Sequence, residues 1–230
     1  MKFEETVIWG FEHAMRGARN PMNSWDRSDS GYGTSDTYES EFVFGPNDLK
    51  LAQQLIKAGN EHRKFLRQIF VSVDITAPLY WWKEFDTYKI GTVASSTSSM
   101  HKLSTTPITI DCFETDDFDS KWFDETGIES ICDTWIVDNI IFFLEELRET
   151  YLRTKDKRYW KELIRFLPES WLQKRTVTMN YENLYSMIRQ RKDHKLNEWS
   201  GKDNAELPNF ISWAKTLPYA DELLFLGLED

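Results

Sequence analysis

Cysteine is scarce in this chain, since the 230 residues include only Cys112 and Cys132. Two cysteines are too few for a disulfide framework or for a typical structural zinc site. The four histidines lie far apart, without the His-Glu-x-x-His pattern of a zinc-binding helix. We therefore expect no metal site. Either cysteine could be a lone nucleophile or a buried thiol, and the apolar segment around Cys132 favours the buried thiol there.

Positive charge and long apolar runs are also lacking. Lys and Arg number 28 against 38 Asp and Glu, which gives a formal net charge of -10. An acidic chain is a poor candidate for non-specific nucleic-acid binding, although a local basic pocket is compatible with it. No apolar run reaches the roughly 18 residues of a membrane-spanning helix, and the N-terminus is too acidic for a signal peptide. We expect a cytoplasmic protein with neither nucleic acid nor membrane as its partner.

Apolar residues are frequent enough for a folded core: hydrophobic residues make up 40% of the chain and aromatic residues 15%. The hydrophobic pattern predicts an α+β fold, a single domain over 1–230 with a central mixed or antiparallel sheet flanked by long helices. A polar loop insertion is expected at about 24–46. The predicted strands are 1–9, 69–76, 106–110 and 174–180. The predicted helices are 11–19, 48–58, 79–91, 134–153, 159–167, 181–192 and 207–215.

The most patterned stretch is 68–102. Its first part alternates β-branched and polar residues from Ile69 to Thr76, which predicts a strand. Pro78 suits the first turn of a helix, which should stop near Gly91. The hydroxyl-rich segment 94–102 then ends in His101 and Lys102, a composition suited to binding phosphate. The alternative is a solvated loop without a ligand.

Two other places carry candidate charges. Arg16 and Arg19 precede an Asn-Pro turn, where they could form an anion site or simply be solvated surface arginines. On the predicted helix 181–192, Arg191 shares a face with Asn180, about 16 Å away at 1.5 Å rise per residue. This face, with Leu184 and Met187 between its polar ends, could lie along an extended ligand. The alternative is a core stripe with a snorkelling arginine.

Four segments, in order, resemble the flavin-dependent thymidylate synthases, a family that uses FAD rather than a cysteine nucleophile. They are 14–19 (AMRGAR), 55–59 (LIKAG) leading to Ala77-Pro78, the helix and loop 79–102, and Arg165 to Pro168 followed by Asn180 to Trp199. Segment 79–102 occupies the place of the family's signature. The family's Arg-His-Arg falls on Thr87-Tyr88-Lys89, so only Lys89 keeps a positive charge there.

The resemblance implies a chemistry and a set of site residues. It implies that FAD is reduced by NADPH, that methylenetetrahydrofolate donates a methylene group to dUMP to give dTMP, and that the protein is a homotetramer. It gives Arg191 the catalytic role, in contact with the pyrimidine. The implied substrate-binding residues are Lys89, Ser98, Ser99, His101, Lys102, Arg165 and Arg191. The implied cofactor-binding residues are Arg19, Ser72, Ile90, Asn180, Ser186 and Gln190.

Three alternatives stay open beside this synthase. An FAD enzyme could act on another substrate or transfer another group. A non-catalytic or substrate-shifted nucleotide- or flavin-binding protein could use the same scaffold. The chain could also be an unrelated α/β interaction protein, with the motif match accidental.

Overall fold

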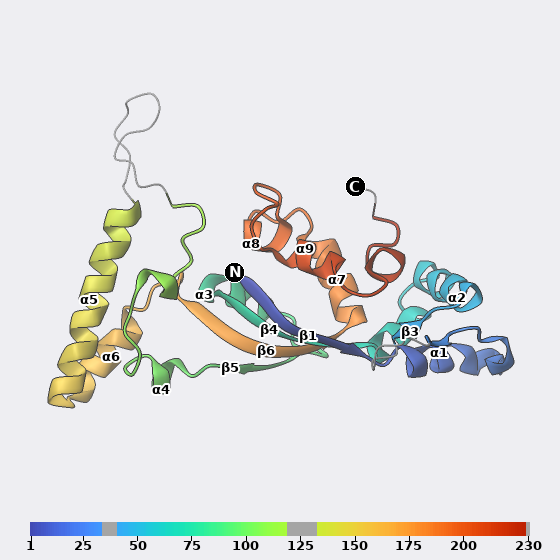
Figure 1. The fold of residues 1–230 in the computed structure, drawn as a ribbon, viewed down its shortest axis with the longest axis horizontal. Helices are drawn as coiled ribbons and strands as arrows, with labels where there is room; N and C mark the ends of the chain where they lie inside the picture. The colour runs from blue at the N-terminus through green and yellow to red at the C-terminus, as the bar shows by residue number, and fades with distance from the viewer. Residues whose placement is uncertain (34–40, 119–132, 229–230) are drawn as a thin grey trace, which may run out of the picture. The chain divides into compact units, whose positions relative to one another are not determined.

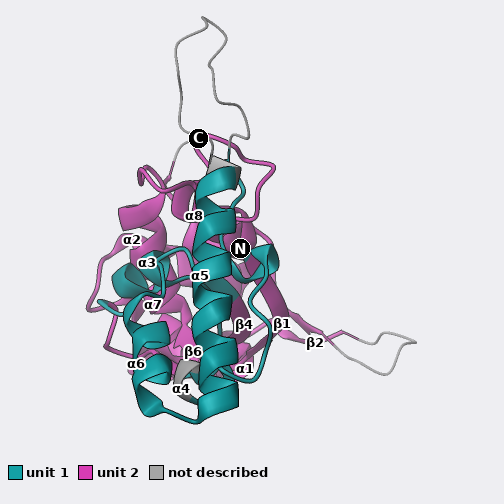
Figure 2. Ribbon diagram, turned by 90° about the vertical axis from the view of Figure 1, so that its left-hand side faces the viewer, with its two compact units in different colours: residues 1, 76–87, 95–175 teal, residues 2–75, 88–94, 176–230 magenta. Residues whose placement is uncertain are grey.

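A computed structural model describes residues 1–33, 41–118 and 133–228, without the side chains of 99, 100, 133 and 134. The chain divides into two compact units (Figure 2). The first comprises residues 1, 76–87 and 95–175, and the second comprises residues 2–75, 88–94 and 176–230. Cys132 lies outside the described residues. The single domain over 1–230 stays a prediction.

Helices and strands together confirm the α+β class. Strands β1 (Lys2–Trp9), β4 (Phe70–Pro78), β6 (Leu172–Asn180) and β5 (Val93–Ser96) form a four-stranded sheet in that order (Figure 1). The α-helices are α1 (Phe11–Arg19), α2 (Pro46–Lys57), α3 (Leu79–Phe85), α4 (Ser99–Lys102), α5 (Asp133–Thr154), α6 (Lys157–Arg165), α7 (Tyr181–Arg191), α8 (Asn197–Ser200) and α9 (Phe210–Lys215). A π-helical turn, Ala220–Leu224, follows them.

The alternation in β4 has the predicted consequence. Val71, Val73 and Ile75 are fully buried, whereas the residues between them are half-buried on the other face. On that face Thr176 donates a hydrogen bond to Asp74 at 2.6 Å, a cross-strand pair that fixes the register of β4 and β6. The β-branched residues of this strand therefore supply core packing on one side and leave a polar surface on the other.

The prediction of a strand at 106–110 is wrong. Pro107 has no N–H for a strand ladder, and the Ile108 N–H donates instead to the Glu145 side chain at 3.0 Å. The prediction that 94–102 is a loop is also wrong in part, because β5 and α4 occupy much of it. Hydroxyl-rich sequence is weak evidence against an edge strand, since Thr and Ser tolerate exposed pairing.

The predicted polar loop at 24–46 contains regular structure. Strand β2 (Gly31–Tyr32) pairs antiparallel with β3 (Phe42–Val43), and Phe42 contacts the ring of buried Phe11 on α1. Residues 34–40 between them lie outside the described residues. Phe11 also packs against Tyr181 and Tyr219, so an aromatic cluster ties this segment to α7 within the second unit.

Asn47 and Asp48 are residue types that can cap a helix over the predicted 48–58, but α2 begins earlier and neither of them is its N-cap. Gly45 takes that position and Pro46 the first turn. The cap comes from outside the helix: the Asp29 carboxylate accepts the N–H groups of Asn47 and Asp48 at 2.9 and 3.0 Å. This carboxylate satisfies two orphan donors and complements the helix dipole. Sequence spacing could not reveal a cap 18 residues upstream.

In the first unit, α3 ends at Phe85 rather than near Gly91. The Thr87 hydroxyl donates to the Glu84 carbonyl at 2.7 Å, and the Thr87 N–H donates to the same oxygen at 3.1 Å. These short-range bonds replace the next helical hydrogen bond, a competition that hydroxyl side chains often win. Arg175 also holds the Asp86 carboxylate at 2.8 Å beside the helix end.

Helix α5 has the predicted bounds to within one residue, but only one side of it is packed. Val137 and Leu144 are buried in the core of the first unit, with Leu163 of α6. Trp135, Ile136, Phe142 and Phe143 are exposed. The apolar residues that recur through 134–153 favour deep packing of this helix, and that expectation is wrong for two of them, Ile136 and Phe143, which are 37% and 45% exposed.

Candidate functional site

Helix α7 has the predicted bounds, and Asn180 precedes it as its N-cap. The Asn180 side-chain oxygen accepts the Asn183 N–H at 3.0 Å, and the Asn183 side-chain oxygen accepts the Asn180 N–H at 3.2 Å. This reciprocal capping box satisfies two backbone donors. Leu184 and Met187 are fully buried. The apolar stripe between Asn180 and Arg191 is therefore core, and the idea of a ligand lying along it is wrong.

Residues 88–94, which belong to the second unit, form a turn that is fixed to the start of α7. The Asn183 amide donates to the Ile90 carbonyl at 2.7 Å. Gly91 has φ +79°, and a Cβ there would lie 2.9 Å from the Asn183 side-chain oxygen and 3.1 Å from the Asn180 amide nitrogen. Only glycine combines this backbone conformation with so close an approach. The turn therefore carries Tyr88 and Lys89 at a defined position.

Arg191, at the end of α7, meets that turn. Its Nε donates to the Tyr88 hydroxyl at 2.8 Å, and the Tyr88 hydroxyl donates to the Gln190 side-chain oxygen at 3.0 Å. The guanidinium carbon lies 4.8 Å from the ring centroid of buried Trp199 and 5.5 Å from that of Tyr88. Two aromatic rings and a hydroxyl thus hold the guanidinium in one place.

Exposed apolar side chains lie on the same turn. Ile90 is 90% exposed and Val93 is 72% exposed, beside the exposed cation Lys89. We name the set Tyr88, Lys89, Ile90, Gln190 and Arg191 the Arg191 cluster. It offers N–H donors, a positive charge and uncovered apolar surface, the combination that suits a planar, carbonyl-bearing ring and an anionic group.

Two other predicted cofactor residues lie in the second unit without a contact to this cluster among the described interactions. Ser72 is on the half-buried face of β4, where its hydroxyl accepts from Thr178 at 3.4 Å. Ser186 is half-buried on α7. The roles of Ser72, Ser186, Ile90, Asn180 and Gln190 in cofactor binding stay predictions.

Arg19 is not a surface arginine. It is 5% exposed, and its guanidinium forms an ion pair with the fully buried Asp48. The Arg19 Nε lies 2.6 Å from the Asp48 carboxylate, which also accepts the Ser28 hydroxyl at 2.7 Å and the Ser30 N–H at 3.2 Å. Burial raises the pKa of the Asp48 carboxyl, but these hydrogen bonds and the charge of Arg19 outweigh it and leave the pKa below its usual value.

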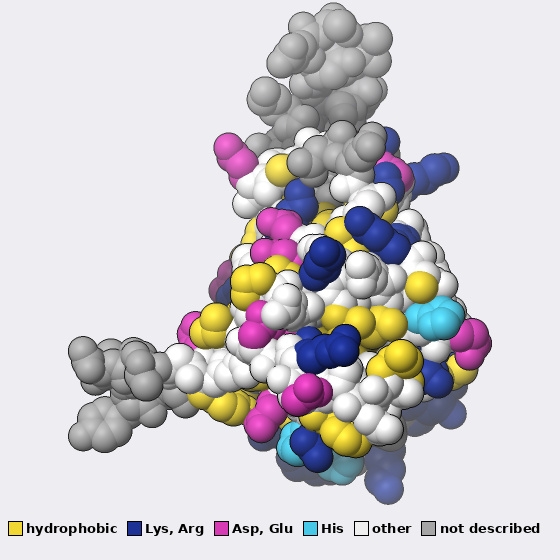
Figure 3. Space-filling model, turned by 90° about the vertical axis from the view of Figure 1, so that its right-hand side faces the viewer, with side chains coloured by type: hydrophobic (Ala, Val, Ile, Leu, Met, Phe, Trp, Pro, Cys, Tyr) yellow, Lys and Arg dark blue, Asp and Glu magenta, His cyan; other side chains and the backbone are white. Residues whose placement is uncertain are grey.

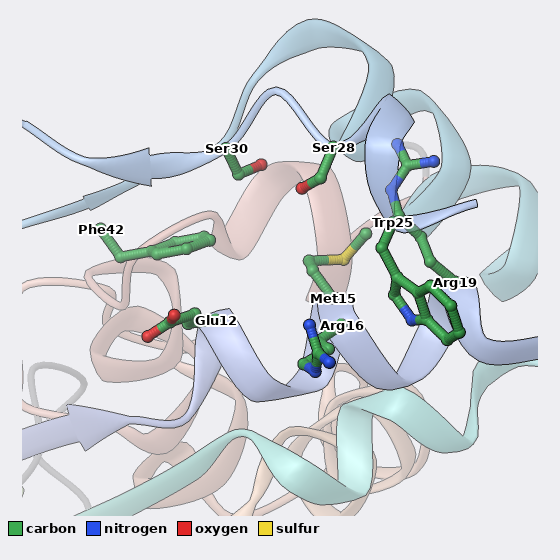
Figure 4. A pocket seen from close by; sticks show the side chains of 8 residues that line it. All are labelled: Glu12, Met15, Arg16, Arg19, Trp25, Ser28, Ser30 and Phe42. Carbon is green, nitrogen blue, oxygen red and sulfur yellow. The ribbon is translucent and has the colours of Figure 1, made fainter. Parts of the chain in front are cut away.

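A small cavity of about 150 Å³ lies beside this ion pair (Figure 4). Figure 4 shows the guanidinium groups of Arg16 and Arg19 pointing in different directions, with the Trp25 ring near the end of α1 that carries Arg19. Arg16 lies over the Trp25 ring at 5.7 Å. The two arginines thus do not converge on one anion site, and binding of a cofactor by Arg19 stays a prediction.

A wider, open pocket of about 520 Å³ includes Arg19, Arg27 and Lys50 in its lining. On the face that carries α1 and α2, Lys and Arg side chains are interspersed with acidic and hydrophobic ones (Figure 3). The net negative charge of the chain therefore does not make this face uniformly acidic.

The remaining predicted substrate residues lie in the first unit. Ser98 caps α4: its hydroxyl contacts His101 Nδ1 at 2.8 Å and accepts the His101 N–H at 3.3 Å. Lys102 is exposed at the end of the same helix. Arg165 forms an exposed ion pair with Glu162 at 2.5 Å. The side chain of Ser99 lies outside the described part, and the substrate roles of all these residues stay predictions.

Sequence reasoning missed two members of this arrangement. Tyr88 falls within the predicted helix 79–91, which in fact ends at Phe85, and Trp199 enters only as the end of a resembling segment. A tyrosine between polar residues, in the segment Asp86 to Lys89, was an available signal. The contact with Arg191, 103 residues later, is a tertiary event without a local pattern.

Three further features of the described residues concern metal ligands, membrane spans and a cysteine. Within 1–33, 41–118 and 133–228, no three His, Cys, Asp or Glu side chains group as metal ligands would. Of the helices that the structure describes, none combines the length and apolar character needed to cross a membrane. Cys112 is half-buried, with its sulfur 4.0 Å from the Pro107 carbonyl.

Comparison with known proteins gives a fold. No family model and no curated protein sequence matches the chain. Among solved structures, the chain resembles the flavin-dependent thymidylate synthase ThyX of Helicobacter pylori, complexed with FAD and dUMP. The TM-score is 0.63 at 18% identity, over 98% of both chains. A second structure of that enzyme with FAD and dUMP gives 0.63 at 17% identity, over 99% of this chain and 100% of the other.

The UMP/dUMP methylase PolB of Streptomyces cacaoi, bound to 5-Br dUMP, is also similar. Its TM-score is 0.59 at 13% identity, over 97% of this chain and 93% of that one. The chain thus has the fold of flavin-dependent thymidylate synthases, from end to end. The resemblance inferred from the four sequence segments is confirmed at the level of the fold.

Proposed function

We propose that this chain is a flavin-dependent methylase of a uracil nucleotide, most simply a thymidylate synthase that converts dUMP to dTMP. The observation that carries the proposal is the shared fold over 98% of both chains with an enzyme solved with FAD and dUMP. The Arg191 cluster supports it, because a guanidinium held at the end of α7 is where the resemblance expects contact with the pyrimidine.

The residues present fit the groups that the proposal requires. Uracil and flavin rings both need apolar surface against their faces and N–H donors at their carbonyl edges. Ile90 and Val93 offer exposed apolar surface, and Gln190 and Arg191 offer donors. FAD would supply the hydride when reduced. The chain's own part is to orient the pyrimidine, stabilise negative charge on its ring and exclude water.

The co-substrates and the assembly belong to the same proposal. NADPH as reductant, methylenetetrahydrofolate as carbon donor, a homotetramer and a cytoplasmic location are all carried from the sequence resemblance. The exposed apolar face of α5 supports self-association, since contiguous exposed aromatic side chains commonly mark interfaces. Phe142→Glu should lower the assembly state in sedimentation, whereas Lys161→Glu, exposed on α6, should leave it unchanged.

A second candidate has a specific observation in its favour. Thr87 and Lys89 stand where the family's signature has its two arginines, and one structural neighbour is described as acting on UMP as well as dUMP. A shifted substrate, or binding without turnover, would follow if phosphate recognition had changed with them. Lys89 offers only a point charge where a bidentate arginine fork would stand.

The test begins with the absorbance spectrum of the purified protein, before and after addition of FAD. An oxidised-flavin spectrum is expected with bound FAD. Tritium release from dUMP labelled at C5, with methylenetetrahydrofolate and NADPH, then measures turnover, and labelled UMP run in parallel separates the two candidates. Failure to bind FAD even at high concentration would remove the flavin-dependent proposal.

A further inference from the structure

The described residues place Tyr88 where it can set the direction of two neighbouring hydrogen bonds. An arginine Nε–H can only donate, so the Tyr88 hydroxyl accepts at the 2.8 Å contact with Arg191. Its single proton then goes to the Gln190 side-chain oxygen at 3.0 Å. Because this oxygen is engaged, the exposed end of the Gln190 amide is its NH2 group.

We propose that Tyr88 is a positioning residue: it holds the Arg191 guanidinium and turns the Gln190 NH2 group outward, so that both side chains present N–H donors to the acceptor edge of a planar ring. This inference rests on the proposed function and deepens it, because it names the edge of the ligand that Gln190 and Arg191 face. That edge carries carbonyl oxygens or unprotonated nitrogens. A ring edge that presents an N–H donor would meet the two side chains as donor against donor and be rejected.

The surroundings of Tyr88 restrict the position of its backbone and of its hydroxyl. Its turn is held by the Asn183 bond to the Ile90 carbonyl and by the close approach of Gly91 to the two asparagines. The hydroxyl of Thr92, in the same turn, donates a hydrogen bond to the Tyr88 backbone carbonyl. On the opposite side, the Arg191 guanidinium lies over the buried Trp199 ring. The backbone and the guanidinium are therefore fixed from separate directions, and the hydroxyl joins them.

The resemblance assigns no role to Tyr88, so this positioning role is additional to the implied site residues. Tyr88 falls on the family's histidine in Arg-His-Arg, in a motif whose arginines are absent here. In this chain the side chain contacts a protein arginine. The altered signature is thus compatible with a retained site, because its residues hold Arg191 in place.

The first experiment needs no ligand. The Arg191 Nε–H resonance, assigned by its loss in Arg191→Lys, should exchange slowly with water in the full-length protein. Tyr88→Phe, which keeps the ring and removes the hydroxyl, should raise that exchange rate at least about tenfold, in line with loss of a hydrogen bond to a charged group. Tyr185→Phe on the same helix is the matched control and should leave the rate unchanged. If the Arg191 Nε–H exchanges at the same rate in the wild type and in Tyr88→Phe, Tyr88 does not hold Arg191 and the proposal is overturned.

The second experiment is a double-mutant cycle on dUMP binding, measured by calorimetry with FAD present. Tyr88→Phe should weaken binding about tenfold in the wild-type background and by less than twofold in Arg191→Ala, because it acts through Arg191. Equal losses in both backgrounds overturn the proposal. If the wild type binds neither FAD nor dUMP, the proposed function fails, while the exchange experiment still shows whether Tyr88 holds Arg191.

Edge selectivity is tested with the same protein. Gln190→Met removes the amide donor, so it should weaken dUMP binding while leaving slow exchange at the Arg191 Nε–H. If Gln190→Met binds dUMP as tightly as the wild type does, the donor surface is not what recognises the ring.

Discussion

Arg19 and Arg191 were both assigned to ligands from the sequence, and the structure surrounds them differently. Arg19 is 5% exposed and paired with a fully buried carboxylate inside the chain. Arg191 is half-buried, oriented by a phenol hydroxyl and two aromatic rings. A guanidinium paired with a fully buried carboxylate has little charge left for a ligand, whereas Arg191 lies half-buried at the end of α7, on the same side as the exposed Lys89 and Ile90 that adjoin Tyr88. The comparison separates a structural arginine from a candidate functional one.

The largest expected effect on stability is at Asp48. Asp48→Ala should lower the free energy of unfolding by about 3–5 kcal/mol, because it leaves the buried Arg19 guanidinium without its counterion. Urea unfolding followed by circular dichroism measures this. Asp26→Ala, at an exposed aspartate nearby, is the control and should change stability by less than about 0.5 kcal/mol. A small effect at Asp48 would mean that Arg19 is free to serve a ligand after all.

At Arg191 we expect a large loss of turnover and only a small change in stability. Arg191→Ala should lower kcat for dTMP formation by about 10²–10³-fold, the usual cost of removing one electrostatic donor from an active site. Its free energy of unfolding should change by less than about 1 kcal/mol, because the side chain is not fully buried. Tritium release and urea unfolding are measured on the same preparations, with adjacent, exposed Lys192→Ala as control. Near-normal turnover in Arg191→Ala would remove it from the site.

Substitutions at two glycines with positive φ, Gly91 and Gly59, test whether the turn 88–94 supports the Arg191 cluster. Gly91→Ala brings a Cβ within 2.9 Å of the Asn183 side chain, whereas a Cβ on Gly59 meets nothing within 4 Å. Both substitutions carry the left-handed backbone cost of about 1–2 kcal/mol. Only Gly91→Ala should in addition weaken dUMP binding, because the turn that carries Tyr88 must shift. Equal ligand affinity in the two variants would show that the turn does not support the site.

Local patterns predicted the elements well and their partners poorly. Helix α1 was predicted at 11–19 and lies there, because its apolar face and the glycine before it are both local signals. The alternation of β4 and the cap at Asn180 are equally local. The error at α3 arose because a stripe including Tyr88 was extended through Thr87, whose hydroxyl ends the helix. The pairing of Arg19 with Asp48, 29 residues apart, has no periodic signature.

In the predicted site, too, positions along the helix were predicted correctly and contacts between distant residues were not. Asn180 and Arg191 were correctly placed at the two ends of one helix by their spacing. That spacing could not distinguish a ligand face from a core stripe, and the complete burial of Leu184 and Met187 decides for the core. Arg191 keeps its candidacy only because it extends past the stripe to Tyr88, a contact that the sequence does not encode locally.

The smallest expected effect concerns pH and extends the comparison to Asp48. Its folded-state pKa lies below the usual value of 3.8, so it binds protons less readily in the folded protein than in the unfolded chain. Its contribution to stability is therefore fully present above about pH 3.8 and is lost as the pH falls through the lower folded-state pKa. Urea unfolding of the wild type between pH 5 and about pH 2 should show a steeper loss of stability than Asp48→Asn, which cannot titrate there. The difference between the two curves isolates Asp48 from the other carboxylates, and parallel curves would show that Arg19 does not hold it ionised.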